Sequence, residues 1–189
     1  IKTKYQKTFL KTNYKVPDYS LKKLLDESNL FLDWYLPKYV KRGKSRILKI
    51  KFNKIFKKLL NNIYYKNKVF VHRDFHISNL MITKKGLGLI DSQDAVYGNI
   101  AYDLASLIDD VRFKTDKKIK NFVFNEFIKK NKHLDLKKFK NDFEILSVMR
   151  NLKIIGIFTR LSVRDKKNKY LKLIPHAWEL IDYRTLNNP

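Results

Sequence analysis

Strand-like sequence occurs in only one part of this chain, and apolar residues at helical spacing fill both flanks. Three short aliphatic runs are expected to be strands, at 69–71, 80–83 and 87–90. The last two flank Lys84-Lys85-Gly86, which is typical of a hairpin turn. From Leu48 to Ile63 apolar residues recur at steps of three and four, as on one face of a helix. The pattern predicts an α+β fold, mostly α-helical, with a small central β-hairpin.

The flanks are expected to be helices joined by short loops. We expect a helix after Ser20, a helix over 30–40 stopped near Pro37, a loop at the RGKS segment after Lys41, one apolar face at Ile119, Phe122, Val123 and Phe127, and a last helix from about Tyr170 through Ile181. With 189 residues, 44% of them hydrophobic, the chain can bury a core. It is therefore expected to form one domain over 1–189.

The net charge of +24 does not by itself indicate nucleic acid as a partner. The excess lies in the flanks, at +14 over 1–67 and +11 over 114–189, whereas 68–113 carry −1. Lys outnumbers Arg by 34 to 8, although Arg is the residue that reads bases and phosphates bidentately. We interpret most lysines as solvent-exposed positions. A polyanion-binding surface, or a basic rim that attracts a nucleotide or acidic sugar, stays open as an alternative.

Several classes of protein are excluded by what the sequence lacks. Without cysteine there is no disulfide framework, zinc–thiolate site or cysteine nucleophile. No run of 18 apolar residues occurs, so no membrane partner is expected. No secretory signal opens the chain, so a cytoplasmic location is expected. Because the first residue is Ile1 and not Met, we expect a fragment whose N-terminus lies upstream.

Four polar side chains between 68 and 113 carry the candidate chemistry: Asp74, Asn79, Asp91 and Asp103. A hairpin over 80–90 would return Asp91 to the side of Asn79, with Asp74 a few residues away. Amide and carboxylate oxygens are ligands that Mg²⁺ accepts, with water and phosphate completing the set. A third carboxylate is then placed to orient or deprotonate an attacking hydroxyl.

This constellation has to be weighed against an ordinary structural role. A single Asp in a loop is usually a turn or cap residue, and His-x-Asp alone is a weak signal. The joint pattern is far more specific: His-x-Asp-x4-Asn, then strand, turn, strand and Ile-Asp. It corresponds to the catalytic loop and metal-binding Asp of kinases.

The segments HRDFHISN and LIDSQDAVYGNIAYDLASL resemble the aminoglycoside phosphotransferase family, the small-molecule branch of the protein-kinase-like fold. Within that family the chain is similar to the anomeric N-acetylmuramate/N-acetylglucosamine kinases. The similar motifs are HRDFH, IDxQDAVYG, FLDWYL at 31–36, NLKIIGIFTRLSVRDKK at 151–167 and YLKLIP at 170–175. The resemblance spans most of 16–176. It implies ATP-dependent phosphorylation of an amino sugar, with Mg²⁺ as cofactor, in cell-wall sugar recycling.

The resemblance also implies a role for each matching residue. Asp74 corresponds to the catalytic Asp that contacts the acceptor hydroxyl, and Asn79 and Asp91 correspond to the two Mg²⁺ ligands. Asp103 corresponds to the Asp that steadies the catalytic loop, and His72 is expected to brace that loop. The possible substrate contacts are His76, Gln93, Asp94 and Trp34; for His76 and Trp34 a packing role is the more common one for such residues.

Two departures from the family pattern affect these expectations. Ser92 stands where the subgroup favours an aromatic residue. The chain also has no glycine-rich loop and no strand Lys paired to a helix Glu before residue 70. We therefore expect a C-terminal lobe whose partner is a missing N-terminal nucleotide lobe, and which is inactive alone. A non-catalytic kinase-like lobe or polyanion-binding protein stays the alternative. Arg150 and Arg160 can pair with a substrate carboxylate or with neighbouring helices.

Overall fold

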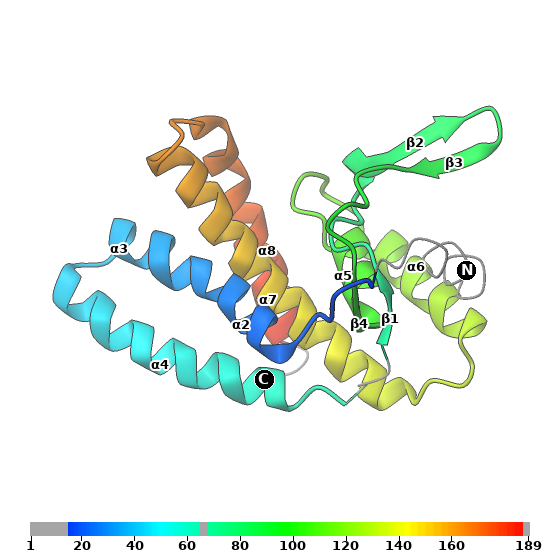
Figure 1. Cartoon of the computed structure of the whole chain (residues 1–189), viewed down its shortest axis with the longest axis horizontal. Helices are drawn as coiled ribbons and strands as arrows, with labels where there is room; N and C mark the ends of the chain where they lie inside the picture. Colours follow the sequence, from blue (N-terminus) through cyan, green and yellow to red (C-terminus); the bar gives the residue numbers. More distant parts are fainter. Residues whose placement is uncertain (1–14, 65–67, 187–189) are drawn as a thin grey trace.

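A helical body and two separate β-ribbons make up the computed structural model, which describes residues 15–64 and 68–186 (Figure 1). Its elements follow in chain order: α2 (Leu21–Leu30), the π-helix η1 (Phe31–Tyr35), α3 (Leu36–Tyr39), α4 (Arg42–Asn61), β1 (Lys68–Val71), the 3₁₀ turn η2 (Ile77–Asn79), β2 (Leu80–Thr83), β3 (Gly86–Leu89), β4 (Val96–Asn99), α5 (Ala101–Ile108), α6 (Lys117–Lys130), α7 (Leu136–Val163), the 3₁₀ segment η3 (Asn168–Leu173) and α8 (Ile174–Thr185). The mostly helical α+β fold and the central hairpin are confirmed.

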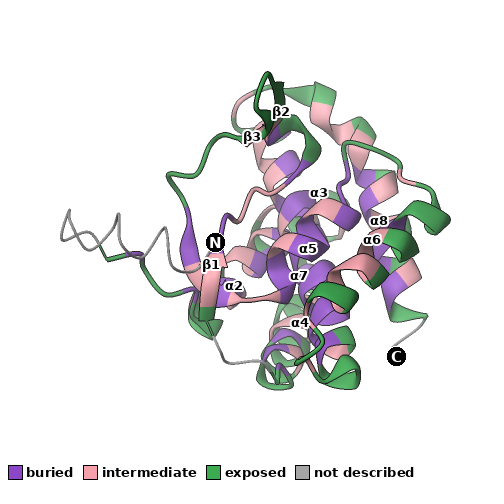
Figure 2. Ribbon diagram, turned by 90° about the vertical axis from the view of Figure 1, so that its right-hand side faces the viewer, coloured by how far each residue is buried: buried purple, intermediate pink, exposed green. Residues whose placement is uncertain are grey.

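The long helix α7 is the centre of the hydrophobic core and packs against α2, η1, α5 and α8. Its N-cap is Asp135, whose carboxylate accepts a hydrogen bond of 3.1 Å from the amide of Lys138. Gly156 lies where α2 and η1 cross α7. A Cβ there would be 2.3 Å from the backbone carbon of Leu30, so glycine permits this close approach. Figure 2 shows the buried residues of α5 and α7 in the middle of the molecule.

Each β-ribbon has two antiparallel strands. In one ribbon β1 pairs with β4, with Val71 opposite Val96, and Pro17–Tyr19 adds hydrogen bonds on the other side of β4. In the other ribbon β2 pairs with β3, with Leu80 opposite Leu89. The second ribbon is the predicted hairpin, and it projects from the helical body (Figure 1). The strand β4 was not predicted.

One prediction about the helices is wrong, and the bounds of others differ by a few residues. The RGKS segment begins α4 and is not a loop, because Ser45 is buried and continues the packed face of Phe56 and Leu60. Packing of this face outweighs the low helix propensity of Gly43. Pro37 lies in the first turn of α3, where its missing N–H costs nothing, and helix continues to Tyr39.

In the C-terminal half the bounds of the last helix differ from the prediction. Residues 170–173 belong to η3, and α8 begins only at Ile174 and ends at Thr185. The helical spacing at Ile119, Phe122, Val123 and Phe127 is confirmed by α6; Val123 and Phe127 pack against the core, whereas Ile119 and Phe122 are exposed. In residues 15–64 and 68–186, no helix is both long and apolar enough to cross a membrane.

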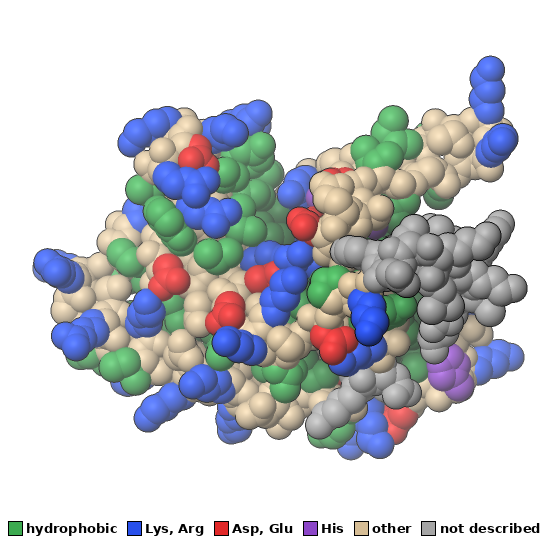
Figure 3. All heavy atoms as spheres, in the orientation of Figure 1, with side chains coloured by type: hydrophobic (Ala, Val, Ile, Leu, Met, Phe, Trp, Pro, Cys, Tyr) green, Lys and Arg blue, Asp and Glu red, His purple; other side chains and the backbone are tan. Residues whose placement is uncertain are grey.

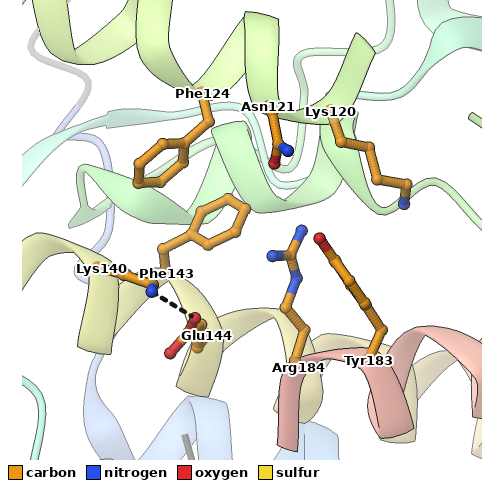
Figure 4. Close-up of a pocket in the computed structure, with 8 residues that line it drawn as sticks. All are labelled: Lys120, Asn121, Phe124, Lys140, Phe143, Glu144, Tyr183 and Arg184. Carbon is orange, nitrogen blue, oxygen red and sulfur yellow. Dashed lines mark ion pairs between the residues drawn. The ribbon is translucent and has the colours of Figure 1, made fainter. Parts of the chain in front are cut away.

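A buried ion cluster around Asp109 joins the last four helices. Asp109 follows α5 and is fully buried; it accepts hydrogen bonds from Lys120 Nζ (2.7 Å), Ser147 Oγ (2.6 Å) and Arg184 Nε (2.8 Å). These donors lie on α6, α7 and α8. Lys120 of α6 and Arg184 of α8 line a pocket of about 240 Å³ between these helices (Figure 4). Burial favours the neutral acid, but the bonds and charges of Arg184 and Lys120 prevail and lower the pKa of Asp109.

We expect Asp109→Asn to destabilise the chain by about 3–5 kcal/mol, because it leaves two buried cations without their counter-ion. The lowered pKa of Asp109 also makes the stability of the fold depend on pH. A carboxylate whose pKa is lowered by folding stabilises the protein above the unfolded-state value of about 3.9, and this contribution is lost as the pH falls through the folded-state value. Chemical denaturation at pH 7 and during acid titration measures both effects.

The matched control for this prediction is Asp33→Asn. Asp33 pairs with Lys49 at 2.6 Å, but both side chains are about half exposed, so the loss should stay below about 1 kcal/mol. Equal losses in the two variants would contradict a structural role for the Asp109 cluster.

Candidate active site

Two loops at the junction of the β-ribbons hold the predicted site residues. The HRD loop (72–79) leads from β1 to β2, and the IDS loop (90–95) leads from β3 to β4. Because β1 pairs with β4 and β2 pairs with β3, both loops pass between the same two ribbons and run side by side.

Three hydrogen bonds join the two loops directly. His72 Nε2 donates to the carbonyl of Ile90 (3.0 Å), and the amide of Ile90 donates to the carbonyl of Asn79 (3.1 Å). Arg73 Nη1 donates to the carbonyl of Asp94 (3.1 Å). These bonds place Asp91, next to Ile90, beside the end of the HRD loop that carries Asn79.

Asp103 holds the start of the HRD loop from the first turn of α5. Its two carboxylate oxygens accept the amides of His72 (2.7 Å) and Arg73 (3.0 Å). Burial raises the pKa of Asp103 in spite of these bonds, which favour the charged form. The bonded carboxylate fixes the backbone of His72 and Arg73, the two residues that precede Asp74.

The HRD loop is also closed on itself around Asp74. The carbonyl of Asp74 accepts the amide of His76 (3.0 Å) and Nδ2 of Asn79 (2.9 Å). This second bond fixes the amide of Asn79 with its nitrogen inward, so Oδ1 is the atom left to bind a ligand. The Asp74 side chain is partly exposed, as a group that meets a substrate must be.

The donor set of Asn79 and Asp91 fits Mg²⁺. The exposed carboxylate of Asp91 accepts a bond from Gln93 Nε2 at Oδ1. Together with Asn79 Oδ1 it offers two hard oxygen ligands, and Mg²⁺ takes the rest from water and phosphates. Across the described ranges, no group of three His, Cys, Asp or Glu side chains is placed to bind a metal, so a cage made of protein ligands alone is not formed there.

Arg73 and its partners were missed by the sequence analysis. Arg73 has a positive φ of 73° and pairs through Nη2 with Glu27 of α2, which also pairs with Lys153 of α7 (2.8 Å). Tyr19 donates a hydrogen bond to the same carboxylate. Asp91 is a second non-glycine residue of the site with positive φ, at 68°. Left-handed backbone in both loops requires support from the surrounding structure, which Glu27 supplies for Arg73.

The four predicted substrate contacts lie in different parts of the structure. Gln93 and Asp94 are exposed in the IDS loop, next to Asp91, and His76 is buried in the HRD loop. Trp34 lies in η1, which packs mainly on α7 and α3. Within the described part of the chain, no hydrogen bond, ring contact or ion pair joins Trp34 to the other three. The aromatic cluster beside it is formed by Phe31, Tyr35 and Trp178.

These loops and helices define a kinase-like lobe. Comparisons with known proteins agree with this class. The sequence profile of the phosphotransferase enzyme family (APH) matches residues 13–123. The chain therefore belongs to the phosphotransferase enzyme family. This confirms the resemblance that the HRDFHISN and LIDSQDAVYG segments suggested.

Two curated relatives narrow the comparison. The chain is 35% identical to an N-acetylmuramate/N-acetylglucosamine kinase of Neisseria meningitidis serogroup B, over 85% of this chain and 50% of the relative. It is 28% identical to a kinase of the same name from Pseudomonas aeruginosa, over 92% of this chain and 53% of the relative. An ethanolamine kinase of Plasmodium vivax shares the fold, with a TM-score of 0.55 and 12% identity over 95% of this chain and 54% of that one. The chain spans about half the length of these proteins.

Proposed function

We propose that this chain is the acceptor-binding and catalytic half of an ATP-dependent sugar kinase that phosphorylates N-acetyl amino sugars. The observation that carries the proposal is the joined pair of loops, which brings Asp74, Asn79 and Asp91 together in a member of the phosphotransferase enzyme family. The acceptor class is taken from the names of the relatives.

In this proposal Asp74 acts on the acceptor. Its carboxylate accepts a hydrogen bond from the sugar hydroxyl, aims the oxygen at the γ-phosphorus of ATP, and takes the proton as the new P–O bond forms and ADP leaves. Asp103 and His72 hold the loop so that little reorganisation is needed. A magnesium ion held by Asn79 and Asp91 would supply positive charge opposite the transferring phosphoryl group.

The exposed hairpin favours the proposal that a second lobe covers the nucleotide. Apolar side chains on β2 and β3 face solvent, including Ile82 at 93% and Leu87 at 77% exposure. Figure 2 shows this ribbon almost entirely as exposed surface. An apolar patch of this kind is typical of a surface that docks another structure. In the relatives, the half that this chain does not match is available for that role.

A polyanion-binding protein is supported less well. Lys and Arg side chains are distributed over the face in Figure 3 and are not gathered into a stripe. Several of them already have acidic partners, such as Lys68 with Asp18 and Lys114 with Glu179.

The experiment that tests the proposal compares the 189-residue chain with a two-lobed form, in which the N-terminal half of such a kinase is also present. We expect the chain alone to show no ATP-dependent sugar phosphorylation, because its sequence contains no glycine-rich loop to cradle the phosphates. The two-lobed form should phosphorylate N-acetylmuramate and N-acetylglucosamine, as measured by transfer of labelled phosphate. The chain alone should also bind a hydrophobic dye and aggregate. Turnover by the chain alone would contradict the proposal, as would a two-lobed form that is inactive on both sugars.

A further inference from the structure

Arg73 connects both loops of the candidate site to the helical body. Its backbone is part of the HRD loop, directly before Asp74. One end of its guanidinium, Nη2, pairs with Glu27 of α2. The other end, Nη1, donates a hydrogen bond to the carbonyl of Asp94 in the IDS loop (3.1 Å). A single planar group therefore links α2, the HRD loop and the IDS loop.

Glu27 anchors this link in the helical body. Its carboxylate pairs with Lys153 of α7 (2.8 Å) and also accepts hydrogen bonds from Arg73 and Tyr19. The side chains of Glu27, Arg73 and Lys153 are between 13% and 15% exposed, so these contacts are electrostatically stronger than they would be in water. Burial alone would raise the pKa of Glu27, but the charges of Lys153 and Arg73 prevail and lower it. The carboxylate is therefore ionised at neutral pH.

Tertiary contacts fix the orientation of Arg73 itself. Its Cζ lies 5.5 Å from the centre of the Tyr19 ring, which packs edge-on against Tyr102 of α5 with 5.0 Å between the ring centres. The backbone φ of Arg73 is 73°, a conformation that a non-glycine residue keeps only where its surroundings impose it. Both the backbone and the side chain of Arg73 are thus held in place, as is required of a residue that positions others.

Asp91 lies between two tethered points of the IDS loop. Ile90, directly before it, is bonded to the HRD loop through both its amide and its carbonyl. Asp94, three residues after it, is bonded to Arg73. Because Asp91 has a φ of 68°, release of the Asp94 end would let this strained backbone relax and its carboxylate move.

We propose that Arg73 is a positioning residue that sets the separation between Asp74 and Asp91. It carries the first of these residues on its own loop and holds the loop of the second through Asp94. The proposed reaction needs the acceptor hydroxyl in line with the phosphoryl group, and a misplacement of about 1 Å can cost on the order of 10²-fold in rate. The inference rests on the proposed function and adds to it the residue that aligns the two loops.

The test measures kcat, KM and Mg²⁺ dependence of the two-lobed form with N-acetylglucosamine as acceptor. In Arg73→Met, which removes both contacts of the guanidinium, kcat should fall by about 10- to 100-fold, because the loops lose their alignment. The KM for the sugar should change by less than about threefold, since Arg73 has no proposed contact with the substrate. The Mg²⁺ concentration that gives half of the maximal rate should rise.

Arg73→Lys distinguishes alignment from charge. Lys keeps the positive charge but lacks the fork, so it can reach Glu27 or Asp94 but not both, and kcat should stay well below that of the wild type. Full recovery in Arg73→Lys would overturn the inference, because charge alone would then be sufficient.

Glu27→Gln tests the anchor and should also lower kcat, because it keeps the shape of the side chain and removes its charge. The matched control is Asp26→Asn, the same chemical change at the neighbouring, exposed position of α2, which should leave kcat unchanged. The double variant Glu27→Gln/Arg73→Met should lose no more than Arg73→Met, since the two residues act through one contact. Additive losses would contradict the inference.

Hydrogen exchange gives a readout besides activity. In the two-lobed form without substrate, exchange over 90–95 should rise by about tenfold in Arg73→Met, the effect of one lost hydrogen bond, whereas exchange over α8 should not change. Unchanged exchange over 90–95, or an equal rise throughout the chain, would overturn the inference. A wild type inactive on both amino sugars would remove the proposed function, and exchange over 90–95 would still decide whether Arg73 holds the loops together.

Discussion

Replacement of Asp91 by Asn in the two-lobed form is expected to abolish Mg²⁺-dependent turnover, with a loss on the order of 10³-fold or more in kcat. The physical reason is charge: in the proposed metal site Asp91 supplies a full negative charge, whereas Asn79 supplies a dipole. Asn79→Ala should therefore weaken turnover less. A titration of rate against Mg²⁺ concentration measures the two variants.

Asn is chosen at position 91 because it removes the charge without straining the backbone. Asp91 has a φ of 68°, a conformation that Asn tolerates and Ala does not favour. Asp91→Ala should also be inactive, but it combines loss of the carboxylate with backbone strain. The matched control is Asp26→Ala on the exposed side of α2, which should leave the rate unchanged. Near-normal turnover and Mg²⁺ dependence in Asp91→Asn would show that the metal assignment is wrong.

Replacement of Asp74 by Asn should lower kcat by about 10²- to 10⁴-fold, the usual contribution of a positioned general base. Nucleotide affinity should change little, because the proposed role of Asp74 is on the acceptor side of the phosphoryl group. The loop should stay intact, since Asn79 and His76 are bonded to the backbone carbonyl of residue 74 and not to its side chain. If the acceptor is an anomeric hydroxyl, which is more acidic than an ordinary alcohol, the loss should fall at the lower end.

Rates with N-acetylmuramate, N-acetylglucosamine and an aminoglycoside, together with ATP binding, measure this effect. Wild-type phosphorylation of the amino sugars at C1, lost in Asp74→Asn with ATP binding intact, is the expected result. Activity on the aminoglycoside alone would contradict the proposed substrate class and leave the family unaffected. Unchanged turnover in Asp74→Asn would remove Asp74 from the mechanism.

Features set by neighbouring residues could be predicted from the sequence. The hairpin over 80–89 was predicted because alternation and the Lys84-Lys85-Gly86 turn are local signals, although β3 begins one residue early. The order of His72, Asp74, Asn79 and Asp91 was sufficient to indicate the kinase family, because the chemistry needs these residue types in this order around a hairpin.

Features that depend on distant partners were decided only by the tertiary structure. Arg73 pairs with Glu27 across 46 residues, and Asp109 binds Arg184 across 75, and no spacing rule relates such pairs. The helix over RGKS forms because its face packs against α2, which outweighs local propensity. Arg150 and Arg160 were equivalent in the sequence; the fold buries Arg150 and leaves Arg160 half-buried further along α7. Local spacing determines which residues can perform the chemistry, whereas long-range packing determines which charges are buried and paired, because pairing depends on what the fold brings into contact.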